Sequence, residues 1–172
     1  NKNMGSTDGA STLATYMNDM YANLQILATS PETGANKAFV VSLAQNLSNG
    51  LRNISGDIQN QRLQADQKIE ETVNTINTTL QSIQQLNEEI AGGGNDAGTA
   101  EYVDQRLYLM ENLAKDMDIQ YFFDSSGRAQ IYTQGGQALL TNEARTISYS
   151  ATTSMNSLVT YPAGFAPISL NG

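Results

Sequence analysis

Residues 69–90 read IEETVNTINTTLQSIQQLNEEI, and their apolar side chains recur at steps of three and four. The apolar positions are Ile69, Val73, Ile76, Leu80, Ile83, Leu86 and Ile90. This spacing places them on one face of an α-helix. The isoleucines alone repeat every seven positions, which is the heptad spacing of a coiled coil. The stretch therefore predicts a helix that buries a narrow apolar stripe against partner helices.

The same stripe extends upstream of this stretch. Its earlier members include Leu51, Ile54, Ile58 and Ala65, and its flanks are the uncharged residues Gln59, Gln61, Asn74, Asn77, Gln81, Gln84 and Gln85. No proline interrupts it, so we predict one helix over about residues 32–91. Gly50 and Gly56 each cost such a helix up to about 1 kcal/mol relative to alanine, but we expect it to be continuous. A helix of that length would form a rod about 90 Å long.

Two shorter helices are predicted on either side of the long one. The segment from Leu13 to Leu27 has one apolar face, and Ser30-Pro31 ends it because a residue before proline is disfavoured in the helical region. Gly92-Gly93-Gly94 ends the long helix, and a third helix follows over about residues 99–117. We expect the short helices to cover the stripe, so that residues 1–117 form a helical bundle domain of about three helices.

The periodicity changes to that of β-strands after residue 117. Ile119–Phe123 and Ala129–Thr133 flank Asp124-Ser125-Ser126-Gly127, which predicts a hairpin. Thr146–Tyr149 alternates as a further strand. The remaining segments, 158–161 and 165–170, predict a second hairpin around Pro162-Ala163-Gly164.

These segments together predict a small, incomplete antiparallel β domain over residues 118–172. The predicted fold class is α+β and mainly α, with a coiled-coil-like bundle built on one long helix and followed by the β unit.

Composition excludes several classes of function. The chain of 172 residues has a net charge of −8 and scattered basic residues, which argues against nucleic-acid binding. It contains no Cys and no His, so disulfides, His-based catalysis and nearly all transition-metal sites are ruled out. Glu70-Glu71 and Glu88-Glu89 are adjacent carboxylates that point about 100° apart on a helix. We predict no catalytic residue, no cofactor and no metal.

The sequence shows no membrane span and no signal peptide, and it does not begin with Met. We interpret it as an internal fragment whose terminal regions are missing.

Asp104-Gln105-Arg106 is the one polar cluster that stands out on the third predicted helix. It has two interpretations. It is either an exposed helix turn with local ion pairing, worth a few tenths of a kcal/mol, or a fixed bridge between the helical part and the β unit. The residues alone leave both open.

The order of these segments over residues 13–151 resembles the flagellar hook-associated protein 1 family, which joins the bacterial hook to the filament. The segments that carry the resemblance are Leu24–Pro31, Ile83–Ile90, Asp104-Gln105-Arg106, Asp124–Tyr132 and Gly135–Leu140. The family's usual Asn-Asp-Leu before the third helix is replaced by Thr99-Ala100-Glu101-Tyr102. Each segment is weakly specific alone, and the specificity lies in their order and spacing.

The resemblance implies a structural, non-enzymatic and extracellular subunit of the bacterial flagellum, exported without a cleaved signal. Its implied partners are copies of itself in a ring, the hook protein and hook-associated protein 3. The export apparatus and a chaperone would bind regions that this sequence lacks. The resemblance implies no nucleic acid and no membrane among the partners.

Two alternatives stay open. One is another flagellar axial protein, such as hook-associated protein 3 or a flagellin. The other is a coiled-coil segment of a signalling protein or adhesin. We expect the fragment itself to be a monomer, because its polar flanks and net charge of −8 oppose association.

Overall fold

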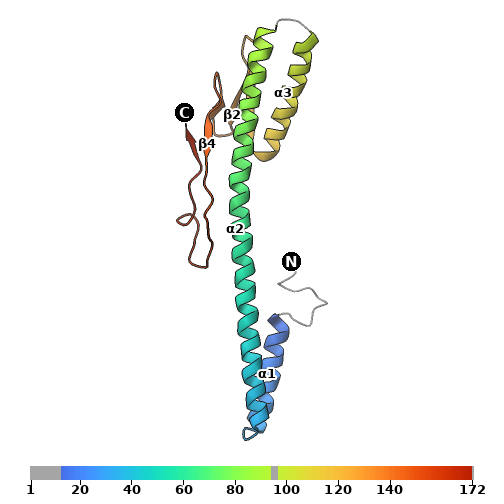
Figure 1. The fold of residues 1–172 in the computed structure, drawn as a ribbon, viewed down its shortest axis with the longest axis vertical. Coiled ribbons are helices and arrows are strands. Elements are labelled where there is room, and N and C mark those ends of the chain that lie inside the picture. Colours follow the sequence, from blue (N-terminus) through green and yellow to red (C-terminus); the bar gives the residue numbers. More distant parts are fainter. Residues whose placement is uncertain (1–12, 94–96, 172) are drawn as a thin grey trace. The chain divides into compact units, whose positions relative to one another are not determined.

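The computed structural model describes residues 13–93 and 97–171, and it contains three helices followed by short strands (Figure 1). The helices are α1 (Leu13–Thr29), α2 (Gly34–Gly92) and α3 (Ala97–Asp116). The strands are β1 (Ile119–Phe123), β2 (Ala129–Thr133), β3 (Ala138–Leu140), β4 (Thr146–Ser148) and β5 (Ser169–Asn171). The predicted fold class, mainly helical with a small antiparallel β unit, is confirmed.

The helices follow the sequence signals closely. The long helix α2 has 59 residues and is continuous through Gly50 and Gly56, as predicted. α1 ends at Thr29, just before Ser30-Pro31. α2 ends at Gly92, and of the predicted glycine break only Gly94 lies outside the described residues. α3 is placed two residues earlier at its start than predicted and ends one residue earlier.

The predicted first hairpin is confirmed. β1 and β2 pair antiparallel from Ile119↔Thr133 to Phe123↔Ala129. The Asp124 carboxylate accepts the backbone N–H groups of Ser126 and Arg128, which fixes the turn. Gly127 has a φ of 75°, in the left-handed region that glycine adopts without strain.

The predicted second hairpin is wrong. Residues 158–161 form no strand, and β5 pairs with β4 through Ile147↔Leu170. The reason is that the segment around Pro162 satisfies its backbone groups locally. Gly164 N–H donates to the Thr160 carbonyl and Phe165 N–H donates to the Pro162 carbonyl, so these groups are not available to a ladder. β3 was not predicted; it has three residues and extends the first hairpin to a sheet of order β1-β2-β3.

The chain divides into two compact units, and the division differs from the predicted boundary at residue 117. Unit 1 comprises Asn1–Leu63 and Ser154–Val159, and unit 2 comprises Gln64–Thr153 and Thr160–Gly172. The division therefore falls inside α2. The strands belong with the last part of α2 and with α3 because all of them share one core.

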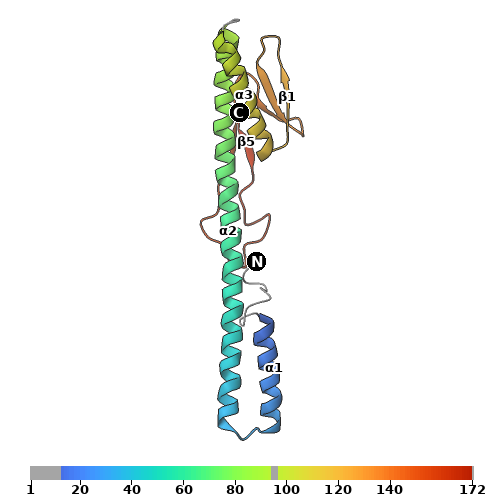
Figure 2. The ribbon, with the colours of Figure 1, turned by 90° about the vertical axis from the view of Figure 1, so that its right-hand side faces the viewer.

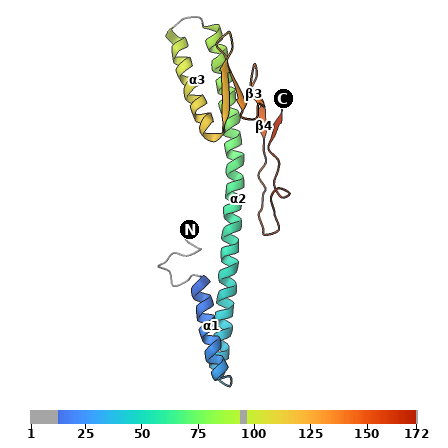
Figure 3. The same ribbon diagram turned by 180° about the vertical axis from the view of Figure 1, so that it is seen from behind.

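The core of unit 2 is built from α2, α3 and the strands. Its buried members are Val73, Ile76, Leu80, Ile83, Met110, Leu113, Ala129, Ile131, Leu139, Leu140 and Ile147. The α2 members follow one another at steps of three and four, so the predicted stripe supplies the helical side of this core. Figure 3 shows α3 on one side of the last part of α2 and β3 and β4 on the other.

Unit 1 is a helix pair with little burial. α1 runs beside the first part of α2 (Figure 2), and the Tyr16 ring lies against Gly50, where a Cβ would be 3.1 Å from Cε2 of that ring. Leu43 on α2 is buried. Arg62 donates to the backbone carbonyls of Asn156 and Val159, which ties residues 154–159 to α2.

Candidate structural site: side-chain clamps between α2 and the strands

Asn87 lies in the core of unit 2 and replaces a missing strand neighbour. Its side chain is 2% exposed. Nδ2 donates to the Ala129 carbonyl at 2.9 Å, and Oδ1 accepts the Ala129 N–H at 2.8 Å. β3 pairs with β2 only at Ile131 and Tyr132, so Ala129 has no strand beside it on that side. A primary amide carries the same donor and acceptor as a peptide group, and it completes the ladder there.

Arg106 reaches the same point from α3. Nη1 donates to Asn87 Oδ1 at 2.8 Å and to the Gly127 carbonyl at 2.7 Å. The guanidinium also lies over the Phe123 ring, 5.0 Å from its centroid. One side chain therefore joins α3, α2 and the turn of the β1–β2 hairpin.

The Arg106 charge is compensated without a carboxylate. The side chain is 4% exposed, and burial lowers its pKa from the ordinary value. Within residues 13–93 and 97–171 no acidic side chain forms an ion pair with it, and Nε has no hydrogen-bond partner there. Carbonyl oxygens and an aromatic face stabilise the cation instead. Removing these acceptors would leave a buried charge unpaired, which is costly.

Asn77 repeats the amide arrangement at the second sheet. Nδ2 donates to the Ile147 carbonyl and Oδ1 accepts the Ile147 N–H, both at 2.8 Å. β4 has β5 on its other edge, so Asn77 closes the edge that faces α2. One heptad further on, Gln84 Oε1 accepts the Ala144 N–H at 2.8 Å. A polar row thus runs along α2 beside its apolar stripe.

Two acidic residues of α2 accept hydrogen bonds from the segment that follows β4. Asp66 is buried; its Oδ1 accepts the Tyr149 hydroxyl and its Oδ2 accepts the Thr152 N–H at 2.6 Å. Glu70 Oε1 accepts the Ala151 N–H at 3.4 Å. The hydrogen bond to Asp66, aided by burial, raises the pKa of Tyr149 to about 12, because ionisation would place two negative charges together.

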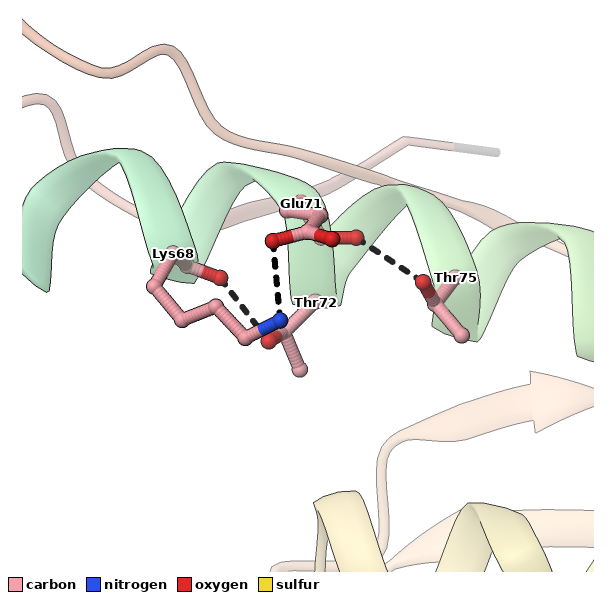
Figure 4. Close-up of polar contacts among 4 residues, drawn as sticks. All are labelled: Lys68, Glu71, Thr72 and Thr75. Carbon is pink, nitrogen blue, oxygen red and sulfur yellow. Dashed lines mark hydrogen bonds and ion pairs between the residues drawn. The ribbon is translucent and has the colours of Figure 1, made fainter. Parts of the chain in front are cut away.

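We call Asp66, Asn77, Gln84, Asn87 and Arg106 the clamp residues. The polar contacts on the solvent side of α2 are of another kind. There Lys68 pairs with Glu71 at 2.8 Å, while Thr72 and Thr75 donate to backbone carbonyls four residues earlier (Figure 4). These contacts stay within one helix, and exposed pairs of this type contribute little.

The predicted cluster on α3 is divided by the structure. Arg106 is buried, whereas Asp104 and Gln105 are exposed, and Gln105 donates to Glu101 on the same helix. Successive helical residues point about 100° apart, so three neighbours cannot share one contact. The bridge is therefore made by Arg106, and the other two residues fit the description of an exposed helix turn.

The predicted stripe residues also differ among themselves. Val73, Ile76, Leu80 and Ile83 are buried, and Ile54 and Ile90 are half-buried. The expectation that the short helices cover the whole stripe is wrong at Leu51, Ile58 and Ile69, which are 49%, 43% and 42% exposed.

The sequence interpretation missed most clamp residues. The pattern places Asn77 and Gln84 on the polar flank of the stripe, and it predicts no role for Asn87 or Asp66. A signal was present for two of them, since Asn87 follows the buried Ile83 by four residues and Asp66 precedes the buried Val73 by one heptad. A polar residue in an apolar position of a heptad pattern indicates a buried hydrogen-bonding role.

The described residues contain no group of His, Cys, Asp or Glu suited to hold a metal ion. Among the described helices none is both long and apolar enough to cross a membrane.

Comparisons with known proteins agree on one family. Residues 2–165 match the family model of the flagellar hook-associated protein FlgK helical domain. The chain is 28% identical over 141 residues to flagellar hook-associated protein 1 of Escherichia coli (strain K12), covering 80% of this chain and 26% of that protein. The fold matches the flagellar hook junction protein FlgK from Burkholderia pseudomallei, with a TM-score of 0.78 and 21% identity, over 99% of this chain and 33% of that one. The chain thus spans about a quarter to a third of these relatives.

Proposed function

The chain belongs to the flagellar hook-associated protein FlgK helical domain family, and from this premise we propose that it is a structural part of a hook-associated protein 1. In this role it joins hook to filament in the bacterial flagellum and catalyses no reaction. The observation that carries the proposal is the family match over residues 2–165. It covers the helices and the clamp residues together.

The geometry of unit 2 supports a mechanical role. α2 is bound to the strands by directional hydrogen bonds at Asn77 and Asn87, in addition to apolar packing. Apolar contacts alone allow neighbouring elements to slide, whereas paired amide bonds fix their register. A subunit that joins two tubular assemblies has to keep its shape under load, and such bonds serve that purpose.

The partners of this subunit are part of the proposal. They are further copies of the protein arranged in a ring, the hook protein on one side and hook-associated protein 3 on the other. The export apparatus and a chaperone act through regions that this chain does not span. The protein works outside the cell. By itself the chain is a monomer, because a net charge of −8 opposes association.

Deletion of the gene in its native host tests the proposal. Electron microscopy of the deletion cells should show hooks without filaments, and the intact gene should restore filaments and swimming. Normal filaments on the deletion cells would overturn the proposal.

Gold labelling of the restored cells separates this role from that of a flagellin. A label confined to the point where hook and filament meet supports a junction protein. A label along the whole filament would instead identify a flagellin.

A further inference from the structure

β1 is the outermost strand of its sheet, and within residues 13–93 and 97–171 no strand pairs with its outer edge. Asp124 N–H donates to the Arg128 carbonyl, which marks a hydrogen-bonded pair next to the turn. In an antiparallel ladder such pairs alternate, so the next one is Phe122 with Gln130. The intervening pair, Phe123 with Ala129, is not hydrogen-bonded, in agreement with the use of both Ala129 backbone groups by Asn87.

The alternation leaves a row of backbone groups along the outer edge of β1. The N–H and C=O of Ile119, Tyr121 and Phe123 point away from β2. An unpaired row of this kind is a template for another strand. In Figure 2 the hairpin of β1 and β2 lies beside α3, to its right.

β1 has none of the features that block strand addition. The strand reads IQYFF, without charge or proline, and its register with β2 is unbroken. Tyr121, Phe122 and Phe123 are 48%, 61% and 48% exposed, so about half of each side chain stays open to solvent beside the contacts with Arg106 and Tyr132. Natural edge strands are usually protected by lysine, proline or a bulge.

The edge is also held in place. The Arg106 guanidinium stacks on Phe123 and bonds the Gly127 carbonyl. The Phe122 ring packs edge-on against Tyr132, with centroids 6.1 Å apart. When a strand binds to an edge that is already fixed, only the incoming strand loses conformational entropy, and this favours association.

Charge indicates what kind of strand fits. Asp118 and Asp124 stand at the two ends of β1. If two copies paired antiparallel about Tyr121, Asp118 would lie directly opposite Asp124 of the second copy. Like charges placed opposite one another destabilise a strand pair. Basic residues at those two places would be favourable.

We propose that the outer edge of β1 binds an extended segment of a different protein, which adds to the sheet as an antiparallel strand. The segment has uncharged side chains along its length and a Lys or Arg at each end. Backbone hydrogen bonds with Ile119, Tyr121 and Phe123 provide the binding, and the two terminal cations face Asp118 and Asp124.

The test is an NMR titration of the ¹⁵N-labelled chain with the peptide acetyl-Lys-Thr-Val-Thr-Val-Thr-Lys-amide. We expect the largest shifts at the amides of Ile119, Tyr121 and Phe123, with slower hydrogen exchange of these amides. The matched probe has Glu in place of both Lys, and we expect it to bind at least tenfold more weakly. Tyr121→Pro should weaken binding of the Lys peptide at least tenfold, whereas Tyr121→Phe should leave it unchanged.

Tyr121→Pro removes an N–H that takes no part in the β1–β2 ladder, so the hairpin should persist. If its hairpin signals are lost, Tyr121→Lys serves in its place, and it should also weaken binding of the Lys peptide. Absence of shifts at the three amides, equal binding of the two peptides, or full binding to an edge variant with an intact hairpin would each overturn the proposal. A dimer of the chain alone that Tyr121→Pro abolishes would also overturn it, because the occupant would then be a second copy.

Discussion

The two parts of α2 have the same apolar periodicity but bury it to very different extents. In unit 2, Leu80 and Ile83 are completely buried. In unit 1, Leu51 and Ile58 remain nearly half exposed. The difference lies in what packs on the helix, since unit 2 adds α3, the strands and the clamp residues, while unit 1 adds α1 and a short loop. A helical stripe therefore identifies the face that can be buried, and distant parts of the chain decide whether it is.

The largest effect expected from this contrast is at a fully buried stripe position. Ile83→Asp places a carboxylate without a partner in the core and should lower the free energy of unfolding by about 4 kcal/mol or more. The matched change in unit 1, Ile58→Asp, should cost less than about 1 kcal/mol because the aspartate stays hydrated. Urea denaturation followed by circular dichroism measures both. Equal losses in the free energy of unfolding would contradict the difference between the two parts of α2.

The next largest effect concerns the amide clamp. Asn87→Ala leaves the Ala129 N–H and carbonyl unpaired and takes an acceptor from Arg106, so we expect a loss of about 3 kcal/mol. Asn74→Ala changes the same residue type on an exposed position of the same helix and should cost less than about 0.5 kcal/mol. If urea denaturation gave similar midpoints for the two variants, the Asn87 contacts would contribute little to the free energy of unfolding.

A smaller effect should appear at alkaline pH. The folded chain holds the Tyr149 proton to a pKa of about 12, above the ordinary value of 10.0, so this group stabilises the fold below pH 10. That contribution is lost as the pH rises from 10 to 12, because the unfolded chain ionises first. Tyr149→Phe should therefore show a shallower fall in stability over this window than the wild type. Tyr108→Phe, which alters an exposed tyrosine, should retain the full slope.

The smallest effect is expected on the solvent side of α2. Lys68 and Glu71 are 69% and 67% exposed, and exposed ion pairs contribute at most about 0.5–1 kcal/mol. Lys68→Ala should shift the urea midpoint little, and raising the salt concentration should shrink the shift further. A loss comparable with that of Asn87→Ala would show that local helix contacts matter as much as the clamps.

The local elements were predictable because their signals are local. The stripe and the absence of proline defined α2, Ser30-Pro31 ended α1, and Asp124–Gly127 defined the first hairpin. The order of these motifs also led to the correct family.

The clamp residues and the last strands were not predictable in the same way. Asn77 stands among polar residues in a chain rich in Asn and Gln, and its half-buried contact forms only because Ile147, 70 residues away in sequence, lies beside it. The segment around Pro162 has strand-like residues on both sides, but its backbone closes on itself and β5 turns to β4 instead. Both outcomes depend on tertiary partners, which short-range patterns do not contain.

The contacts of the clamp residues also affect the order in which the two units fold during synthesis of the chain. The Asn87 contact spans 42 residues, the Asn77 contact 70, and the contact of Asp66 with Thr152 spans 86. Closing longer loops costs more entropy and slows folding. A nascent chain can pair α1 with the start of α2 early, yet the stripe from Val73 to Ile83 has to wait for strands that are synthesised later. We therefore expect the helix pair of unit 1 to form first and the sheet of unit 2 to close last.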